Sequence, residues 1–263
     1  MRSFLFLWVS LAAICTISAQ ESPKKQDPGD RGKISEDGKF TPTPPQDETT
    51  TPKSPEAALE ELMGQSTIVP QGKGKFKLGL VEFNATSKTL AIPVRVNMVE
   101  NPVEYVLVHE DGKKHESILT TTARPEHIHL ACLLLGTTPL SIQNWPKDQQ
   151  GIPKLNCAQV QLKWATNGPD RVVDIAELIT FQNHPNTSSE YPKGPWLYSG
   201  SYFRGGGFAA QAEGSIISII GDHAALINGL RSTRQNDEQH IPNPAALPRK
   251  GRNATLEIKL QQP

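Results

Sequence analysis

The feature that most limits the fold of this chain is the uneven distribution of its large apolar side chains. Between residues 20 and 55 only Ile34 and Phe40 are large and apolar, among many Pro, Lys, Asp, Glu and Thr residues. A segment of this composition cannot bury enough apolar surface to offset the entropy lost on ordering. We therefore interpret residues 20–55 as a disordered linker and expect the folded part of the protein to follow it.

The N-terminal residues have the layout of a secretory signal peptide. The positive charge of Arg2 is followed by an apolar run over residues 4–14 and then by small residues that end at Ala19, which predicts cleavage after Ala19. The run is shorter than the roughly 20 apolar residues of a membrane anchor, and Ile14 is too large to precede a lipidated Cys15. No later segment is long and apolar enough to be a transmembrane segment, so the sequence predicts a periplasmic or secreted protein.

The rest of the chain is dominated by short β-rich runs, which predict a sheet-rich domain over residues 75–260. Strands are expected near residues 78–83, 90–98, 158–165, 171–175, 196–199, 214–220 and 255–260. Asp111-Gly112, between the runs 104–109 and 114–119, predicts a hairpin, and Pro125 and Gly136 bound a predicted helix with an apolar stripe. We expect an α+β fold, a sheet-rich single domain of mostly antiparallel strands with one central helix packed on the sheet.

A short stretch between the linker and this domain has helix signals of its own. Ser54 suits the N-cap, Pro55 suits the first helical position and Gly64 suits the end of a helix. The predicted organisation is a signal peptide over 1–19, a disordered linker over 20–55, a short helix and connector over 56–74, and a globular domain over 75–260.

The charge balance and the cysteines limit the partners that the chain can have. With 27 basic and 27 acidic residues the formal net charge is zero, so no basic excess attracts nucleic acid or an anionic membrane surface. Signal cleavage removes Cys15 and leaves Cys132 and Cys157. In an oxidising compartment these two can form a disulfide, whereas Cys132, inside an apolar run, is equally consistent with a small core residue.

Six stretches of the domain carry a family resemblance. They are residues 105–108 (Tyr-Val-Leu-Val), 112–117 (Gly-Lys-Lys-His-Glu-Ser), 127–131 (His-Ile-His-Leu-Ala), 133–136 (Leu-Leu-Leu-Gly), 196–201 (Trp-Leu-Tyr-Ser-Gly-Ser) and 214–218 (Gly-Ser-Ile-Ile-Ser). Together they resemble the YdjY-like domain of exported bacterial proteins, common in planctomycetes and verrucomicrobia. The resemblance covers about residues 75–260 and implies no assigned biochemical role.

Some members of that family carry a ferredoxin-like label, and the cysteine count argues against extending it to this chain. An iron–sulfur cluster needs about four cysteine thiolates, or two with two histidines, at set spacings. The chain left after signal cleavage has two isolated cysteines and lacks the paired ligand spacings. No cofactor is therefore predicted, and a divalent metal remains the open alternative.

The stretch Lys114-His115-Glu116-Ser117 is the best candidate for chemistry, because imidazole and carboxylate groups together bind divalent metals or act as acid and base. On a strand, His115 and Glu116 would point to opposite faces. The hairpin register decides their partners: a two-residue turn pairs Val108 with His115, whereas a three-residue loop pairs His109 with His115. The alternative interpretation, which we favour, is a hairpin with solvated polar side chains.

His127 and His129 have the appearance of a second metal-binding pair. If both lie in the predicted helix, they are about 200° apart around its axis and cannot bind one ion together. Chelating histidines on a helix are four residues apart. Either one can still reach toward the predicted hairpin, although packing or capping is the simpler role for each.

Two functional hypotheses follow from these observations. The first is a non-catalytic exported module that binds an unknown protein or envelope ligand through its sheet face or loops. The second is a metal-dependent, hydrolase-like enzyme that uses His115 or Glu116 with His109, His127 or His129. The first is favoured because the sequence contains no complete catalytic constellation.

Overall fold

The computed structural model describes residues 33–34, 40–41, 55–184, 187–204 and 207–261. The chain divides into two compact units, Met1–Thr49 and Thr50–Pro263. In the first unit the strands β1 (Lys33–Ile34) and β2 (Phe40–Thr41) pair antiparallel, with Ile34 opposite Phe40. The predicted signal peptide, its cleavage after Ala19 and most of the predicted linker lie outside the described residues, and the predicted domain boundaries stay predictions.

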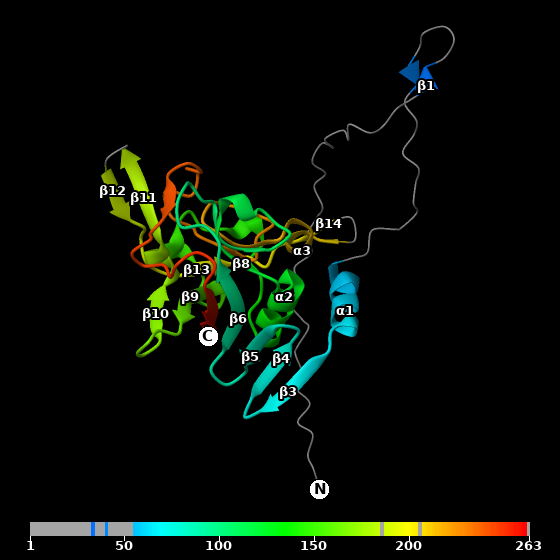
Figure 1. Cartoon of the computed structure of the whole chain (residues 1–263). Coiled ribbons are helices and arrows are strands. Elements are labelled where there is room, and N and C mark those ends of the chain that lie inside the picture. The colour runs from blue at the N-terminus through cyan, green and yellow to red at the C-terminus, as the bar shows by residue number, and fades with distance from the viewer. Residues whose placement is uncertain (1–32, 35–39, 42–54, 185–186, 205–206, 262–263) are drawn as a thin grey trace. The chain divides into compact units, whose positions relative to one another are not determined.

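The second unit, whose ribbon is drawn in Figure 1, is built on a sheet whose strand pairings close it into a barrel. Among the described residues, eight strands form the closed ring, each hydrogen-bonded to the next. In order around the barrel they are β9 (Cys157–Trp164), β13 (Trp196–Tyr198), β17 (Ile227–Asn228), β16 (Ser215–Ser218), β7 (Tyr105–His109), β8 (Ser117–Thr121), β6 (Thr89–Val96) and β19 (Asn253–Leu260).

Closure of the barrel depends on β19, which pairs antiparallel with β6 on one side and with β9 on the other. The predicted α+β fold, a sheet with one central helix packed on it, is therefore wrong. A closed sheet covers its apolar face with its own strands and leaves no free edge between them, so the core does not need a helix as its second layer. The alternation of β19 indicated a strand, but it did not indicate two partner strands.

Further strands extend the barrel sheet or flank it. Beyond β9 lies β10 (Arg171–Asp174), and beyond β6 lie β5 (Val81–Asn84), β4 (Lys75–Leu78) and β3 (Ile68–Gly72) in that order. A separate antiparallel sheet contains β12 (Thr187–Glu190), β11 (Ile179–His184) and β18 (His240–Pro242). The strands β14 (Phe203–Arg204) and β15 (Gly207–Phe208) form a two-stranded ribbon.

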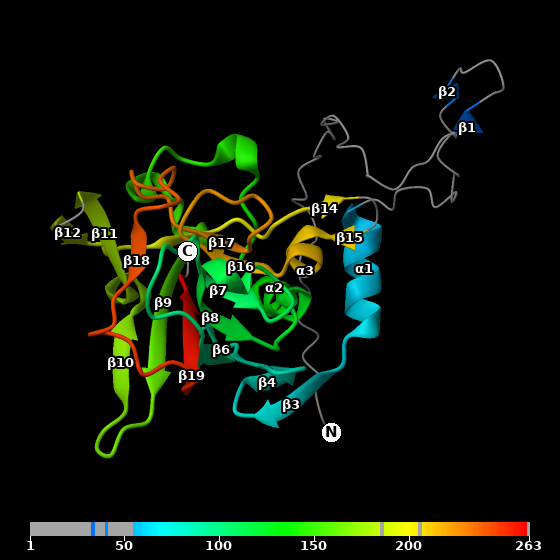
Figure 2. The same ribbon diagram turned by 45° about the horizontal axis from the view of Figure 1, so that its top comes forward.

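The helices of the described residues are short. They are α1 (Pro55–Gln65), α2 (Pro125–Leu134), α3 (Ala209–Glu213) and the 3-10 turns η1 (Lys114–Glu116), η2 (Ile142–Asn144), η3 (Gln149–Gly151), η4 (Lys154–Asn156) and η5 (Ile175–Leu178). The helix α2 begins at Pro125 and ends just before Gly136, whose φ of +89° suits glycine. It packs against β5, β6 and α3, and Figure 2 shows it beside α3. None of these helices is long and apolar enough to cross a membrane.

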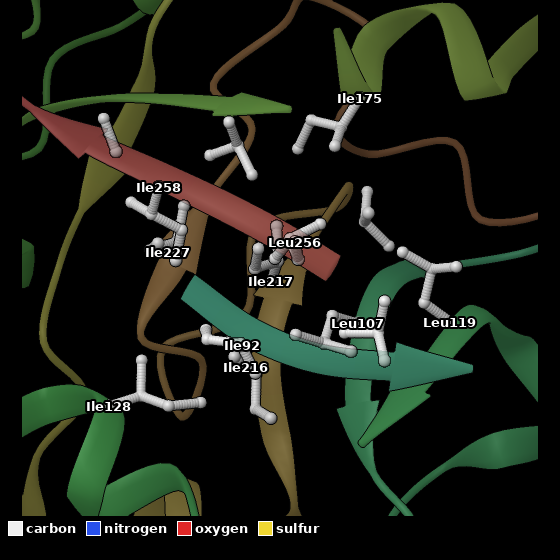
Figure 3. Close-up of a cluster of buried hydrophobic side chains, with 14 of the residues drawn as sticks. Ile92, Leu107, Leu119, Ile128, Ile175, Ile216, Ile217, Ile227, Leu256 and Ile258 are labelled. Carbon is white, nitrogen blue, oxygen red and sulfur yellow. The ribbon is translucent and has the colours of Figure 1, made fainter. Parts of the chain in front are cut away.

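The core of the barrel is formed by the apolar half of each alternating strand. Ile92 on β6 and Leu256 and Ile258 on β19 are completely buried, while their strand neighbours Pro93 and Glu257 are exposed. Figure 3 shows these three side chains in one cluster with side chains from β7, β8, β16 and α2. Each buried aliphatic side chain contributes about 1.5–3 kcal/mol to folding, so the alternation alone specifies which face of the strand points inward.

The strands β7 and β8 are parallel neighbours, with Leu107 opposite Leu119, so the predicted hairpin at Asp111-Gly112 is wrong in both registers. Parallel strands usually need a connection of about a dozen residues or more, whereas here residues 110–116 suffice. We call residues 110–116 the return segment. It passes close over the start of β16, where a Cβ atom added to Gly214 would lie 2.8 Å from the Cα atom of Gly112.

Candidate functional site

His109, a predicted metal ligand, lies at the end of β7 with its side chain only 12% exposed. The backbone N–H of Asp111 donates a hydrogen bond of 3.3 Å to its Nδ1 atom. The Asp111 carboxylate lies 3.4 Å from the same nitrogen. The Nδ1 atom of His109 therefore already has a partner in Asp111, two residues further along the chain.

His115 and Glu116 lie in the 3-10 turn η1 rather than on a strand. The Nε2 atom of His115 is 3.8 Å from Oε2 of Glu116, so the two side chains approach each other instead of pointing to opposite faces. The His115 side chain is 80% exposed. The structure thus brings this pair together on the surface of the return segment.

His127 and His129 both lie in α2 but have different surroundings. His127 is half-buried and lies against Gly79, and burial and the nearby Arg124 lower its pKa. His129 is buried, and its Nδ1 atom is 2.9 Å from the hydroxyl oxygen of Tyr198. Burial lowers the pKa of His129 to about 4, so this side chain is neutral near pH 7.

The predicted ligands do not meet at one point. His109 is engaged with Asp111, His115 with Glu116, and His129 with Tyr198. Over the described part of the chain, no group of three or more His, Cys, Asp and Glu side chains is arranged to hold a metal ion.

Cys132 and Cys157, for which the sequence left open a disulfide or a core position of Cys132, are both buried free thiols in the structure. Cys132 belongs to the barrel core, whereas Cys157 belongs to a smaller apolar cluster with Leu197 and Leu230. Burial raises the pKa of both thiols. Because the thiolate is the reactive form of cysteine, both side chains are poor nucleophiles in this fold.

A hollow of about 750 Å³ lies where β6, β8 and the start of β19 meet the return segment, and we call it the groove. It is lined by Pro93, Val94, Arg95, Val96, Asn97, Glu110, Lys114, Thr120, Thr121, Thr122, Lys250, Gly251, Asn253 and Ala254. Three stretches far apart in the sequence supply these residues. The pairing of β6 with both β8 and β19 brings them together.

The charged side chains of the groove are mostly positive. Arg95, Lys114 and Lys250 line it, against the single carboxylate of Glu110. None of these three cations forms an ion pair with a carboxylate of the described residues. A second hollow of about 400 Å³ shares Asn97, Lys114 and Lys250 with the groove. The two lysines therefore lie where the two hollows adjoin.

Hydrogen bonds to backbone carbonyl oxygens position Arg95 and Lys114. Arg95 occupies an exposed position of β6, and its Nε–H group donates to the carbonyl oxygen of Gly251 over 3.2 Å. The Nδ2 atom of Asn97 donates to the carbonyl oxygens of Lys114 (2.6 Å) and Ser117 (2.8 Å). These bonds fasten both ends of η1 to the end of β6 and hold Lys114 at the groove.

Sequence reasoning missed these cations as functional candidates. Arg95 is an outward-facing position of a predicted strand, and Lys114 lies in the stretch already selected for His115 and Glu116. The local sequence around Arg95 and Lys114 does not indicate which other segments of the chain lie beside them in the fold. Lys250 has no comparable signal, because it lies in a polar connection before β19.

A smaller hollow of about 310 Å³ adjoins a hydrogen-bonded chain of polar side chains. The Nζ atom of Lys113 donates to the hydroxyl oxygen of Tyr105 (2.8 Å), which in turn donates to Oδ2 of Asp222 (2.9 Å). Burial and the Asp222 carboxylate raise the pKa of Tyr105, so its hydroxyl keeps its proton. The chain ties the return segment to the loop that follows β16.

Comparison of the chain with protein-family models identifies its domain. The YdjY domain matches residues 81–259, a range that begins with β5 and contains all the segments that line the groove. Comparisons with curated proteins and with solved structures gave no match. Since the matched range is more than half of the chain, this protein belongs to the YdjY domain family.

Proposed function

We propose that this protein is an exported, non-catalytic binding module and that the groove holds its ligand. The observation that carries the proposal is the hollow of about 750 Å³ lined by Arg95, Lys114 and Lys250, none of them ion-paired within the described residues. Cations gathered in a hollow raise the local concentration of oppositely charged ligands. Binding pockets of this size suit small molecules or short segments of a polymer.

A non-catalytic role is supported by the state of the groups that could carry chemistry. His129 is buried, neutral and bonded to Tyr198. Cys132 is buried with a raised pKa, which keeps it a thiol. His115 and Glu116 approach each other at the surface but have no third ligand group within the described residues. A metal-dependent activity has no specific observation in its favour.

Export is supported by the N-terminal pattern and by the resemblance to exported proteins of planctomycete and verrucomicrobial type. The ligand would then belong to the cell envelope, either as a polymer or as a protein. Expression of the full chain in a bacterium, followed by fractionation and N-terminal sequencing, tests this part. We expect an exported product that begins at Gln20, and a cytoplasmic product that still begins at Met1 would contradict it.

A sterically obstructed variant tests the binding site itself. Thr122 is exposed and lines the groove, so Thr122→Trp places a bulky side chain in it without removing a charge. Thr138 is also exposed but lies outside the groove, so Thr138→Trp is the matched control. The probes are neutral oligosaccharides, uronic acids, amino sugars and sugar phosphates, and binding is followed by NMR chemical shifts of the purified protein.

The expected result is that at least one probe shifts the amide signals of residues 94–97, 110–116 and 250–254. Thr122→Trp should abolish these shifts, and Thr138→Trp should leave them unchanged. Shifts that map to another face, or that survive in Thr122→Trp, would overturn the proposal.

A further inference from the structure

We infer that the ligand of the groove is an elongated saccharide that carries carboxylate or phosphate groups. This inference rests on the proposed function and deepens it by naming the ligand chemistry. The groove and the second hollow share Asn97, Lys114 and Lys250. A ligand longer than one sugar unit can therefore extend from one hollow into the other and pass both lysines.

The charges of the two hollows favour an anionic ligand. Arg95, Lys114 and Lys250 are opposed by Glu110 in the groove and by Glu100 in the second hollow. The Nε–H group of Arg95 is fixed on the carbonyl oxygen of Gly251, which orients the guanidinium group and leaves its terminal N–H groups for a ligand. A guanidinium group held in this way binds carboxylate and phosphate oxygens in pairs.

The uncharged part of the lining favours a saccharide. The side chains of Thr120, Thr122 and Asn253 line the groove, and hydroxyl and amide groups match the donors and acceptors of sugar hydroxyls. The exposed ring of Pro93 offers an apolar surface among them. Nucleic acid fits less well, because no Phe, Tyr or Trp side chain is among the lining residues of either hollow to stack on a base.

Calorimetric titration of the purified protein tests the inference with three trisaccharides of equal length. The first carries uronic acid carboxylates, the second carries phosphate groups and the third is neutral. We expect at least one acidic trisaccharide to bind at least about tenfold more tightly than the neutral one, and its affinity to fall as salt is raised. Binding of only one acidic form identifies the anionic group and equally supports the inference.

Charge-removing variants test which lysine side chains bind the anionic groups of the trisaccharide. Lys114→Gln and Lys250→Gln should each weaken binding of the acidic trisaccharide about fivefold, and the double variant about 25-fold, if the two contacts are independent. Lys259 is exposed on β19 and lies outside both hollows, so Lys259→Gln is the matched control and should leave the affinity unchanged.

The outcomes separate this inference from the proposed function. If the neutral trisaccharide binds as tightly as the acidic ones and Thr122→Trp still blocks it, the inference fails and the groove remains a binding site. If an acidic trisaccharide binds equally well to Thr122→Trp and to both lysine variants, the inference and the proposed function both fail. Absence of binding by all three trisaccharides overturns the inference.

Discussion

At the scale of single residues, the return segment depends on the contact between two glycines. Gly214 has a φ of +70°, and a Cβ atom there would lie 2.8 Å from the Cα atom of Gly112 and 3.0 Å from its nitrogen. These neighbours are backbone atoms, which cannot rotate away as a side chain would. A methyl group at position 214 therefore has to displace the return segment or the start of β16.

Gly214→Ala should lower the free energy of unfolding by about 2 kcal/mol or more, because it combines a left-handed backbone with a backbone clash. Gly221→Ala is the control, since a Cβ atom there meets nothing within 4 Å and its φ is not positive. Urea denaturation of both variants measures the difference. Equal midpoints for the two variants would contradict the close crossing of Gly112 and Gly214.

Two buried histidines make the stability of the fold depend on pH. His129 and His240 are buried, and burial lowers the pKa of each from 6.5 to about 4. Above pH 6.5 both are neutral in the folded and the unfolded chain. Between pH 6.5 and 4 the unfolded chain binds protons that the folded chain does not, so the free energy of unfolding decreases as the pH falls.

The decrease in the free energy of unfolding should reach about 3 kcal/mol for each histidine near pH 4, because one pKa unit corresponds to about 1.4 kcal/mol. His129→Gln removes one of these protonation sites and should flatten the pH dependence by that amount, whatever its effect at pH 7. Denaturation curves between pH 4 and 7 provide the measurement. A pH dependence as steep in His129→Gln as in the unmodified protein would count against the burial argument.

At the scale of elements, local signals predicted individual strands better than their pairing. The strands predicted near residues 158–165 and 171–175 correspond to β9 and its antiparallel neighbour β10, with Val173 opposite Leu162. The helix α2 begins at Pro125 as expected. The signal at Asp111-Gly112 was equally strong, but Gly112 is required there for its contact with Gly214 and not for a hairpin turn. Nothing in the local sequence distinguishes these two uses of a glycine.

Backbone contacts measured by NMR distinguish the parallel pair from a hairpin. We expect nuclear Overhauser effects between Tyr105 and Ser117 and between Leu107 and Leu119, the partners of the parallel register. The effects between Val173 and Leu162 provide an internal reference for an antiparallel pair. Strong effects between residues 108 and 115, as in the two-residue hairpin, would instead contradict the parallel arrangement.

At the scale of the whole molecule, the pairing of β6 with β8 and with β19 brings the parts of the groove together. Arg95 comes from β6, Lys114 from the return segment and Lys250 from the connection before β19. Their meeting requires that β19 lies beside β6 and that β7 and β8 are parallel, and neither property is encoded in a local pattern. The stretch that includes Lys114 was selected from the sequence because of its histidine and glutamate, but the cations around it became visible only in the fold.

Three distant segments converge on the groove, and we propose that it binds anions. Hydrogen–deuterium exchange of the protein, with and without an acidic trisaccharide, tests it most directly, because ligand contact slows the opening of the backbone it touches. We predict slower exchange at residues 94–97, 110–116 and 250–254 together, and unchanged exchange in β11 and β12. Slower exchange in only one of the three segments, or in β11 and β12 instead, would contradict the claim.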